Sequence, residues 1–249
     1  MTSSRLTKKM YPVGMAVYDP VAVKYAEVFN DIHLRLFEWP WLEGLIGKLK
    51  PRSLLDLGCG NGYLAEALSP RVPELYAAEP SVPLFEIARQ RLGGGARPPV
   101  NLYNAAAEDL PFASGFFDVV VSLLSFRYMD WDKALGEIHR VLRPGGTFIL
   151  IDLFAARFNP LCFGAYLITW AKLRRQYAAN RDYRRKLQEL SRNSDWQDMV
   201  REHPKRELGS AKQAIGKKFR ISAEKLLSAG LRGKVTGLVC VKTDEARLQ

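Results

Sequence analysis

The sequence predicts an α/β protein built on a doubly wound, mostly parallel, Rossmann-like sheet. Two observations support this fold class: short apolar segments alternate with helix-period segments, and a glycine-rich turn follows the first apolar segment. We divide the chain into four parts: an N-terminal helical cap (1–52), a core (53–156), a basic helical lid inserted after the fifth strand (157–221), and a closing helix and strand (222–249).

The N-terminal cap has apolar residues at helical intervals. This spacing runs from Asp19 to Leu36, and Trp39-Pro40-Trp41 then leads into a second helix that ends near Leu49. We therefore expect two helices before the first strand of the sheet.

Residues 54–68 (LLDLGCGNGYLAEAL) combine a strand, a glycine loop and a helix start. The strand is apolar and ends in the carboxylate of Asp56. Three glycines permit a tight turn and the close approach of a ligand: Gly58, Gly60 and Gly62. The helix that begins at Tyr63 directs free N–H groups at the same place. The glycine spacing departs from the dinucleotide fingerprint G-x-G-x-x-G, and a turn that serves packing alone is the alternative.

A second acidic residue follows the next short strand. Leu75–Glu79 reads as a strand that ends in a carboxylate, 23 residues after Asp56. In doubly wound sheets an acid at this spacing binds ribose hydroxyls. A solvated loop acid is the alternative for Glu79.

The later strands follow the same α/β alternation. Residues 117–122 read as a buried fourth strand, 134–142 as a helix ended by Arg143-Pro144-Gly145-Gly146, and 147–153 as an apolar fifth strand. After the lid, the spacing predicts a helix over 222–229 and one strand over 235–241, so the usual sixth strand is expected to be abbreviated or missing.

These elements resemble the class I S-adenosylmethionine-dependent methyltransferases in order and spacing over residues 50–155. The glycine loop carries the resemblance together with NAAAEDLPF (104–112), which is similar to the family's G-D-A-E-x-L-P-F loop, and HRVLRPGG, which is similar to R-V-L-K-P-G-G. Ala106 departs from the pattern, because it stands where the family has an adenine-contacting Asp. The adenine amino group is then left to Glu108, Asp109 or the backbone. Residues 122–146 and the tail GKVTGLVCVK are loosely similar to the ubiquinone/menaquinone C-methyltransferases and small-molecule methyltransferases.

The resemblance implies a cofactor, S-adenosyl-L-methionine. The residues that it places at the cofactor are Asp56, Gly58, Cys59, Gly60, Gly62, Glu79, Pro80, Ala107, Glu108 and Ser122. A titrating side chain is required only if the acceptor must lose a proton. Of the three histidines, His33 in the cap is the best-placed base, while Tyr18 or Tyr25 could present a hydroxyl or ring to the sulfonium. A structural role on an amphipathic helix is the alternative for each. No metal site is expected.

The positive charge of the chain lies in the lid. Residues 157–220 hold sixteen Lys and Arg and six acids, which is +10 of the net +11. The lid begins with an apolar stretch that could pack on the core, line an oily substrate pocket, or lie on a membrane. We expect an amphiphilic acceptor, with its oily part near Leu161, Phe163, Leu167 and Trp170 and its acidic part near Arg174, Arg175, Arg184 and Arg185. A solvated helical lid is the alternative.

Other features limit the compartment and the partners. The three cysteines (Cys59, Cys162 and Cys240) are too widely separated for a disulfide framework or a metal site. The polar N-terminus lacks a secretory signal, and the longest apolar run, 161–170, is shorter than the roughly 20 residues that cross a bilayer. We expect a cytoplasmic protein with no transmembrane segment, in contact with a small molecule rather than nucleic acid. Peripheral membrane contact through the lid remains open.

The leading hypothesis is therefore methyl transfer from S-adenosylmethionine to a small hydrophobic or anionic acceptor. Two alternatives remain: a non-catalytic relative that keeps the nucleotide site, and a methyltransferase that acts on nucleic acid. The intact glycine loop and Glu79 argue against the non-catalytic reading, whereas Ala106 favours it.

Overall fold

The protein is an α/β fold around a seven-stranded sheet. The computed structural model describes residues 18–94, 99–156, 163–230 and 233–243. The strands are β1 (Ser53–Leu57), β2 (Glu74–Ala78), β3 (Asn101–Tyr103), β4 (Phe117–Leu123), β5 (Leu142–Phe154), β6 (Phe219–Gly230) and β7 (Gly233–Lys242). Their order is β3-β2-β1-β4-β5-β7-β6, with β7 antiparallel to both of its neighbours and the other pairs parallel. The predicted doubly wound fold class is confirmed.

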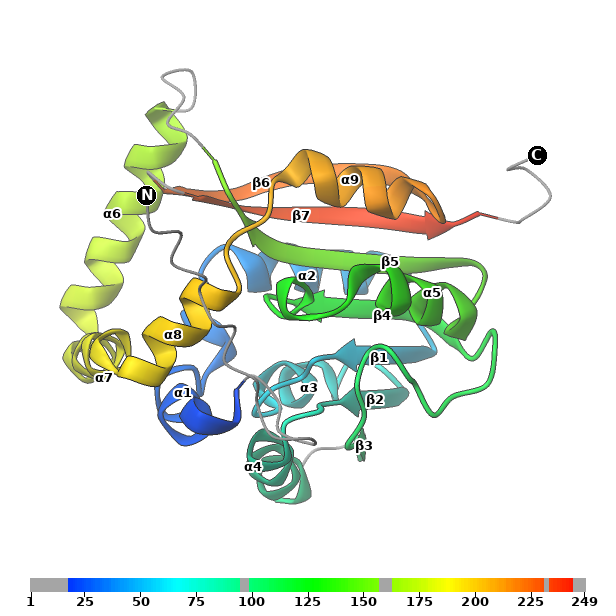
Figure 1. Cartoon of the computed structure of the whole chain (residues 1–249), viewed down its shortest axis with the longest axis horizontal. Helices are drawn as coiled ribbons and strands as arrows, with labels where there is room; N and C mark the ends of the chain where they lie inside the picture. The colour runs from blue at the N-terminus through cyan, green and yellow to red at the C-terminus, as the bar shows by residue number, and fades with distance from the viewer. Residues whose placement is uncertain (1–17, 95–98, 157–162, 231–232, 244–249) are drawn as a thin grey trace, which may run out of the picture.

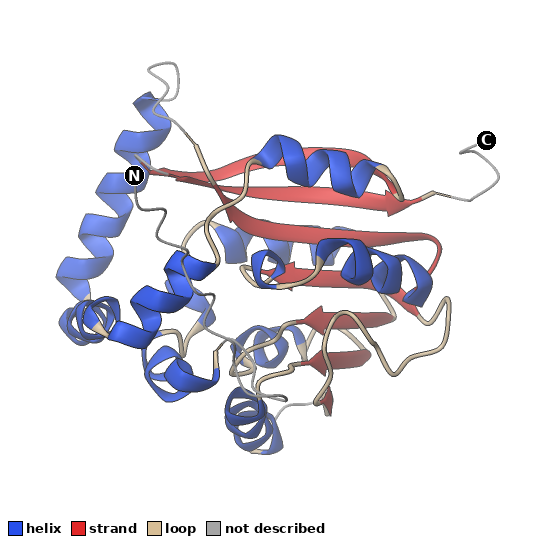
Figure 2. Ribbon diagram, in the orientation of Figure 1, coloured by secondary structure: helices blue, strands red, loops and turns tan. Residues whose placement is uncertain are grey.

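Helices cover both faces of the sheet (Figures 1 and 2). One apolar cluster joins the sheet to α5 (Trp131–Val141) and α9 (Leu208–Gly216). A second joins it to α2 (Glu38–Leu49), α3 (Tyr63–Leu68) and α4 (Val82–Gly93). Because both faces are covered, β1 is buried along its whole length, and three of its five residues are leucines.

The strand order reverses between β1 and β4. From β1 the chain proceeds outward to β2 and β3, and then returns to β4 on the other side of β1. In open α/β sheets, ligands bind outside the carboxyl ends of the strands at such a reversal point. The glycine loop follows β1 directly, so it lies at this position.

The N-terminal segment is not the continuous helix that was predicted for Asp19 to Leu36. It contains α1 (Ala22–Val28) between two short 3₁₀ turns, η1 (Asp19–Val21) and η2 (Ile32–Leu34). The helix ends because the side chain of the buried Asn61 donates to the carbonyl of Phe29 at 2.7 Å and to that of Ala26 at 3.4 Å. A residue of the glycine loop thus holds the end of α1.

The helix predicted over residues 222–229 is wrong, because these residues belong to β6. The sixth strand is therefore neither abbreviated nor missing, and it pairs with β7 along its length. Its register shifts between Ile221 and Ala223 and again between Leu226 and Ser228. Such bulges interrupt the period of two that identifies a strand. The helix before this strand is α9, which lies inside the range that was assigned to the lid.

The lid segment contains three consecutive helices, α6 (Phe163–Ala179), α7 (Arg181–Arg192) and α8 (Ser194–Glu202). They lie beyond the carboxyl ends of the parallel strands (Figure 1), where α7 contacts α1 and α8 contacts η1. The predicted contact of Leu161 with the acceptor falls outside the described residues, as does Cys162. In the four described ranges, no helix is long and apolar enough to span a bilayer.

The first and last parts of the chain meet on one face of the sheet. Trp41 of α2 covers Gly237 of β7, where a Cβ atom would lie 2.3 Å from the indole ring. Glycine is therefore required at this position for the cap to reach the sheet.

Candidate active site

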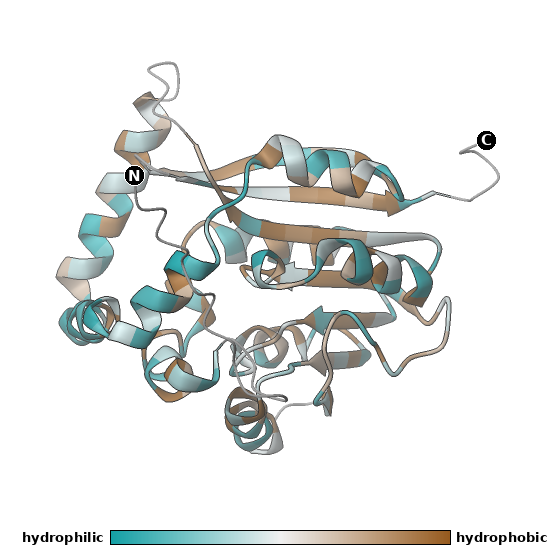
Figure 3. Ribbon diagram, in the orientation of Figure 1, coloured by the Kyte–Doolittle hydropathy of each residue, from teal (hydrophilic) through white to brown (hydrophobic). Residues whose placement is uncertain are grey.

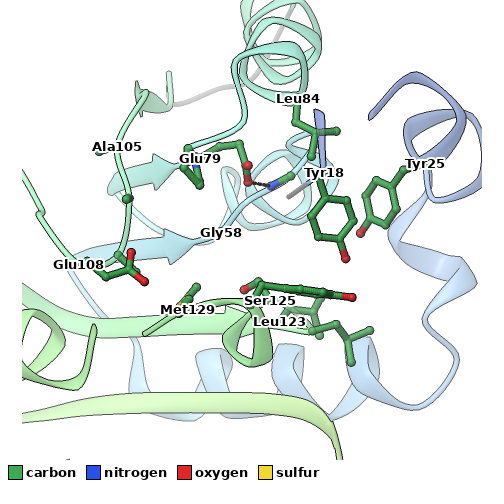
Figure 4. Close-up of a pocket in the computed structure, with 16 residues that line it drawn as sticks. Tyr18, Tyr25, Gly58, Glu79, Leu84, Ala105, Glu108, Leu123, Ser125 and Met129 are labelled. Atoms are coloured by element: carbon green, nitrogen blue, oxygen red, sulfur yellow. Dashed lines mark hydrogen bonds between the residues drawn. The ribbon is translucent and has the colours of Figure 1, made fainter. Parts of the chain in front are cut away.

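A pocket of about 240 Å³ opens at the carboxyl ends of β1, β2 and β4. Figure 4 shows it between two tyrosines of the cap, Tyr18 and Tyr25, and the loop of Ala105 and Glu108 that follows β3. Its remaining walls come from the glycine loop, the start of α4 and the segment after β4. The lining residues are Tyr18, Tyr25, Gly58, Gly60, Glu79, Pro80, Leu84, Ala105, Ala106, Ala107, Glu108, Leu123, Leu124, Ser125, Tyr128 and Met129.

The glycine loop wraps tightly around the end of β2. The N–H groups of Gly58 and Cys59 both donate to the carbonyl of Ala78, at 2.9 and 3.0 Å. Three glycines have positive φ angles: Gly58, Gly60 and Gly62. A Cβ at Gly58 would lie 2.6 Å from Ser125 Oγ, whereas a Cβ at Gly62 would meet the Cβ of Ala88 at 3.2 Å. Gly58 therefore permits close packing beside the pocket, and Gly62 permits close packing of α3 against α4.

Glu79 joins the glycine loop to the start of α4. Its carboxylate accepts hydrogen bonds from the N–H groups of Gly60 at 2.8 Å and Ser81 at 2.9 Å. Burial raises the pKa of Glu79 to about 7, although these two hydrogen bonds oppose the shift. Each carboxylate oxygen retains a free lone pair, so the side chain can still accept from a ligand in the pocket.

Asp56 is a second buried carboxylate behind the loop. It is 1% exposed, and its Oδ2 atom has no hydrogen-bond partner among the described residues. Burial and, to a lesser extent, the charge of Glu79 raise the pKa of Asp56 to about 8. Two carboxyl groups with raised pKa values at adjacent strand ends form a site that favours hydrogen-bond donors and positive charge.

The opposite wall of the pocket is aromatic. The ring of Tyr18 packs edge-on against those of Tyr25 and Tyr128, with centroid distances of 5.0 Å in both pairs. Burial raises the pKa of all three phenols, so they remain protonated at neutral pH. Tyr25 also stacks on Trp196 of α8 at 6.3 Å. The lid and the cap therefore meet at the rim of the pocket.

Two hydrogen bonds of Arg127 support Tyr128 from behind. The Arg127 guanidinium donates to the hydroxyl of Tyr128, and the Arg127 backbone N–H donates to the buried carboxylate of Asp152 at 3.0 Å. The ring of His203, after α8, packs against Tyr128 at 5.3 Å. These contacts hold the phenol in place at the pocket wall.

The predicted site residues divide into two groups. The pocket is lined by Tyr25, Gly58, Gly60, Glu79, Pro80, Ala107 and Glu108. Asp56, Cys59 and Ser122 are buried behind this wall, and Gly62 packs against α4. Ser122 does not line the pocket, but its hydroxyl is hydrogen-bonded at 2.9 Å to that of Ser125, which does.

His33 lies outside the pocket. It is exposed on η2, with its N–H bound to Asp31 at 2.8 Å. The break after α1 turns the chain away from the site, so the structure gives His33 no contact with a substrate. Among the three histidines, the one that packs on a pocket residue is His203.

The segment after β4 was missed as a source of site residues. Ser125, Tyr128 and Met129 all line the pocket, and none of them stands in a recognisable motif. The available signal was positional, since this segment follows the strand next to β1 at the reversal point.

The fold and the pocket define a doubly wound α/β protein with a candidate ligand site at its central reversal point. Residues 55–150 match the family model described as methyltransferase domain. A demethylmenaquinone methyltransferase of Thermus thermophilus is 39% identical over 105 residues, which are 41% of this chain and 47% of that one. A demethylmenaquinone methyltransferase of Thermotoga maritima is 30% identical over 166 residues, which are 63% of this chain and 70% of that one. The chain aligns with about half the length of the Thermus protein.

A solved structure shows the same fold. A SAM-dependent methyltransferase from Aquifex aeolicus superposes with a TM-score of 0.62 and 15% identity, over 89% of this chain and 98% of that one. The chain belongs to the class I S-adenosylmethionine-dependent methyltransferase superfamily.

Proposed function

We propose that this protein binds S-adenosylmethionine in the pocket at β1, β2 and β4 and transfers its methyl group to a small, quinone-like acceptor. The observation that carries the proposal is the pair of buried carboxyl groups, Asp56 and Glu79, on either side of the glycine loop. The acceptor class follows from the relatives, which are named demethylmenaquinone methyltransferases.

The donor set of the pocket suits this cofactor. S-adenosylmethionine carries hydroxyl donors on its ribose, an ammonium group and a sulfonium. Glu79 keeps lone pairs for hydroxyl donors, and the unpartnered oxygen of Asp56 lies directly behind the loop. Gly58 and Gly60 leave the pocket wall without side chains, where a Cβ would otherwise intrude. When bound, the cofactor supplies a methyl group that is already activated for transfer.

The chain itself then has three tasks: to hold the two reactants in line, to exclude water and to position the acceptor. The cap tyrosines close the pocket on one side. Leu123, Leu124 and Met129 give the acceptor an apolar surface. Because the Tyr128 hydroxyl accepts from Arg127, its own proton is free to be donated to an acceptor oxygen.

Calorimetry with S-adenosylhomocysteine tests the cofactor site. Glu79→Ala should weaken binding by about 1.5–3 kcal/mol, the range for hydrogen bonds to a charged group. Gly60→Val should abolish binding, because its side chain would enter the pocket beside Tyr25. The matched control is Glu86→Ala, which removes an exposed acid of α4 that is paired with Arg89. Parental affinity in both site variants would refute this assignment.

Proton linkage gives a second test. Binding of a cation should lower the raised pKa values of Asp56 and Glu79 and release protons near pH 7. For S-adenosylmethionine, the calorimetric enthalpy should therefore depend on the ionisation enthalpy of the buffer. S-adenosylhomocysteine lacks the sulfonium charge and should release fewer protons. Equal release by the two ligands would contradict a role for these carboxyl groups in binding the cation.

A second candidate is a binding protein that keeps the nucleotide site without transferring a methyl group. Ala106 favours it, because this pocket residue stands where the family has an acid. Incubation with labelled S-adenosylmethionine and demethylated quinones, followed by mass spectrometry, separates the two candidates. Label in a quinone supports the enzyme, and cofactor binding without transfer to any acceptor supports the binding protein.

A further inference from the structure

Helix α6 presents an apolar face to solvent. Four of its large apolar side chains are about half exposed or more: Phe163 (55%), Leu167 (49%), Ile168 (58%) and Trp170 (59%). The other side of the helix is anchored, since Thr169 Oγ1 accepts from the Ala229 N–H at 3.2 Å and Gln176 donates to the Leu34 carbonyl at 3.1 Å. The exposed face therefore belongs to a helix held in a fixed orientation. Large exposed apolar patches mark interaction sites.

Positive charge adjoins this face. Residues 163–192, which form α6 and α7, hold eight Lys and Arg and two acids. Six of these cations have no carboxylate partner within the described ranges: Lys172, Arg174, Arg175, Arg181, Arg184 and Arg192. Figure 3 shows the change of character, from mixed brown and teal along α6 to mainly teal at α7.

The apolar and basic surfaces share one groove. Trp170 and Arg174 of α6 line it together with Arg184 and Leu187 of α7. The Arg174 guanidinium lies 5.2 Å from the centre of the Trp170 ring. A second, almost wholly apolar groove continues from Trp170 along Leu167 to the end of β6. A cation beside an aromatic ring, followed by aliphatic side chains, is the pattern of a surface that meets lipid headgroups and acyl chains.

We propose that the outer face of α6, with the cations at its junction with α7, docks on the surface of an anionic lipid bilayer. Helices that lie in the membrane interface bury an apolar face to a depth of about 5–10 Å and place Lys and Arg among the headgroups. The positive charge of this surface argues against a second copy of the chain as the partner that covers it. Two such faces, each with a net charge of +6 over 163–192, would repel one another.

The location of α6 connects this surface to the pocket. α6 contacts α7, α7 contacts α8, and Trp196 of α8 stacks on the pocket residue Tyr25. If the acceptor is a membrane-dissolved quinone, a premise that rests on the proposed function, it would enter beside a rim already at the bilayer. Docking itself requires neither methyl transfer nor a bound acceptor.

The test is flotation of the 249-residue chain with vesicles of phosphatidylcholine, with and without 30% phosphatidylglycerol. The parent should bind the anionic vesicles, and this binding should weaken as salt is added. Arg175→Glu/Arg181→Glu/Arg184→Glu should reduce binding on the order of 100-fold, since each cation near such a surface contributes about fivefold. The matched control is Lys48→Glu/Lys133→Glu/Lys225→Glu, with the same change in net charge at exposed positions on α2, α5 and β6.

Insertion of the apolar face is tested by fluorescence. Lipids brominated on their acyl chains should quench the parent and should not quench Trp170→Phe. Leu167→Gln/Ile168→Gln should weaken binding at least tenfold while leaving the melting temperature and S-adenosylhomocysteine affinity unchanged. Failure to bind anionic vesicles, or equal loss in the control triple variant, would overturn the proposal. The proposal would also be overturned if sedimentation showed a dimer for the parent and a monomer for Leu167→Gln/Ile168→Gln. Because cofactor affinity is measured separately, failure of docking leaves the proposed cofactor site standing.

Discussion

Alanine in place of Gly58 or Gly60 gives a matched test of the glycine loop. Both residues have positive φ angles, +72° and +58°, so an added side chain costs about 1–2 kcal/mol of backbone strain at either position. The surroundings differ. A Cβ at Gly58 would lie 2.6 Å from Ser125 Oγ and 2.7 Å from its Cβ, whereas a Cβ at Gly60 would have its nearest neighbour, Tyr25, at 3.7 Å.

The difference between the two variants isolates the contact with Ser125. In both variants, alanine restricts the unfolded chain more than glycine does, and this offsets about 0.4–1 kcal/mol of the strain. Overpacking adds about 1–3 kcal/mol only at Gly58, so Gly58→Ala should lower the free energy of unfolding by that much more than Gly60→Ala. Urea unfolding measures both values in the absence of cofactor.

A double-mutant cycle with Ser125→Gly completes the experiment. Removing the serine side chain should cancel most of the additional cost of Gly58→Ala and leave the cost of Gly60→Ala unchanged. The Ser125 hydroxyl also donates to the Leu57 carbonyl at 3.0 Å, and the cycle cancels the loss of that bond. Equal costs for the two alanine variants, or no coupling to Ser125, would refute the reasoning.

Three further predictions follow from buried groups. Glu79→Gln should destabilise the fold by about 1–3 kcal/mol even without cofactor, because its NH₂ group would face the N–H of Gly60 or Ser81; thermal melts against the exposed control Glu86→Gln measure this, and equal melting temperatures would contradict it. Asp56 keeps its proton up to about pH 8 in the folded protein, whereas the unfolded chain releases it near pH 4. The free energy of unfolding of the parent should therefore fall relative to that of Asp56→Asn as pH rises from about 5 to 8. If urea unfolding gives a constant difference in this free energy across the range, the raised pKa is contradicted. Gly237→Ala should lower the free energy of unfolding by about 1–3 kcal/mol through its contact with Trp41, and the cost should vanish in a Trp41→Ala background if that contact is its cause.

The central sheet could be predicted because its signal is local. Strands buried on both faces read as continuous apolar runs, and the turn after β1 requires glycine for reasons visible in its spacing. β6 could not be predicted, because two bulges bring its apolar residues away from strict alternation and toward a helical period. These residues form a strand because they pair with β7, and β7 lies outside the local sequence around residues 222–229.

The site was predictable only where a motif marks it. Glu79, Gly58 and Gly60 lie in recognisable positions relative to strand ends, and they do line the pocket. Tyr128 reaches the pocket because β4 lies beside β1 in the sheet, which is a property of strand order rather than of local sequence. The prediction of His33 as a site residue assumed a continuous cap helix. Asn61, which is distant in the sequence, binds the end of α1 and so ends that helix before His33.

The position of β7 has a consequence for the order in which the protein can be made. β7 is the last of the described strands in sequence order, yet it lies between β5 and β6 and carries the glycine on which Trp41 packs. On the ribosome, β1 to β4 emerge early and can pair while synthesis continues. The indole of Trp41, translated nearly two hundred residues before Gly237, cannot reach its native partner until that strand has left the ribosome. A nascent chain stalled before β7 should therefore leave the indole of Trp41 uncovered and the edge of β5 open, the state in which this protein is most exposed to association with other chains.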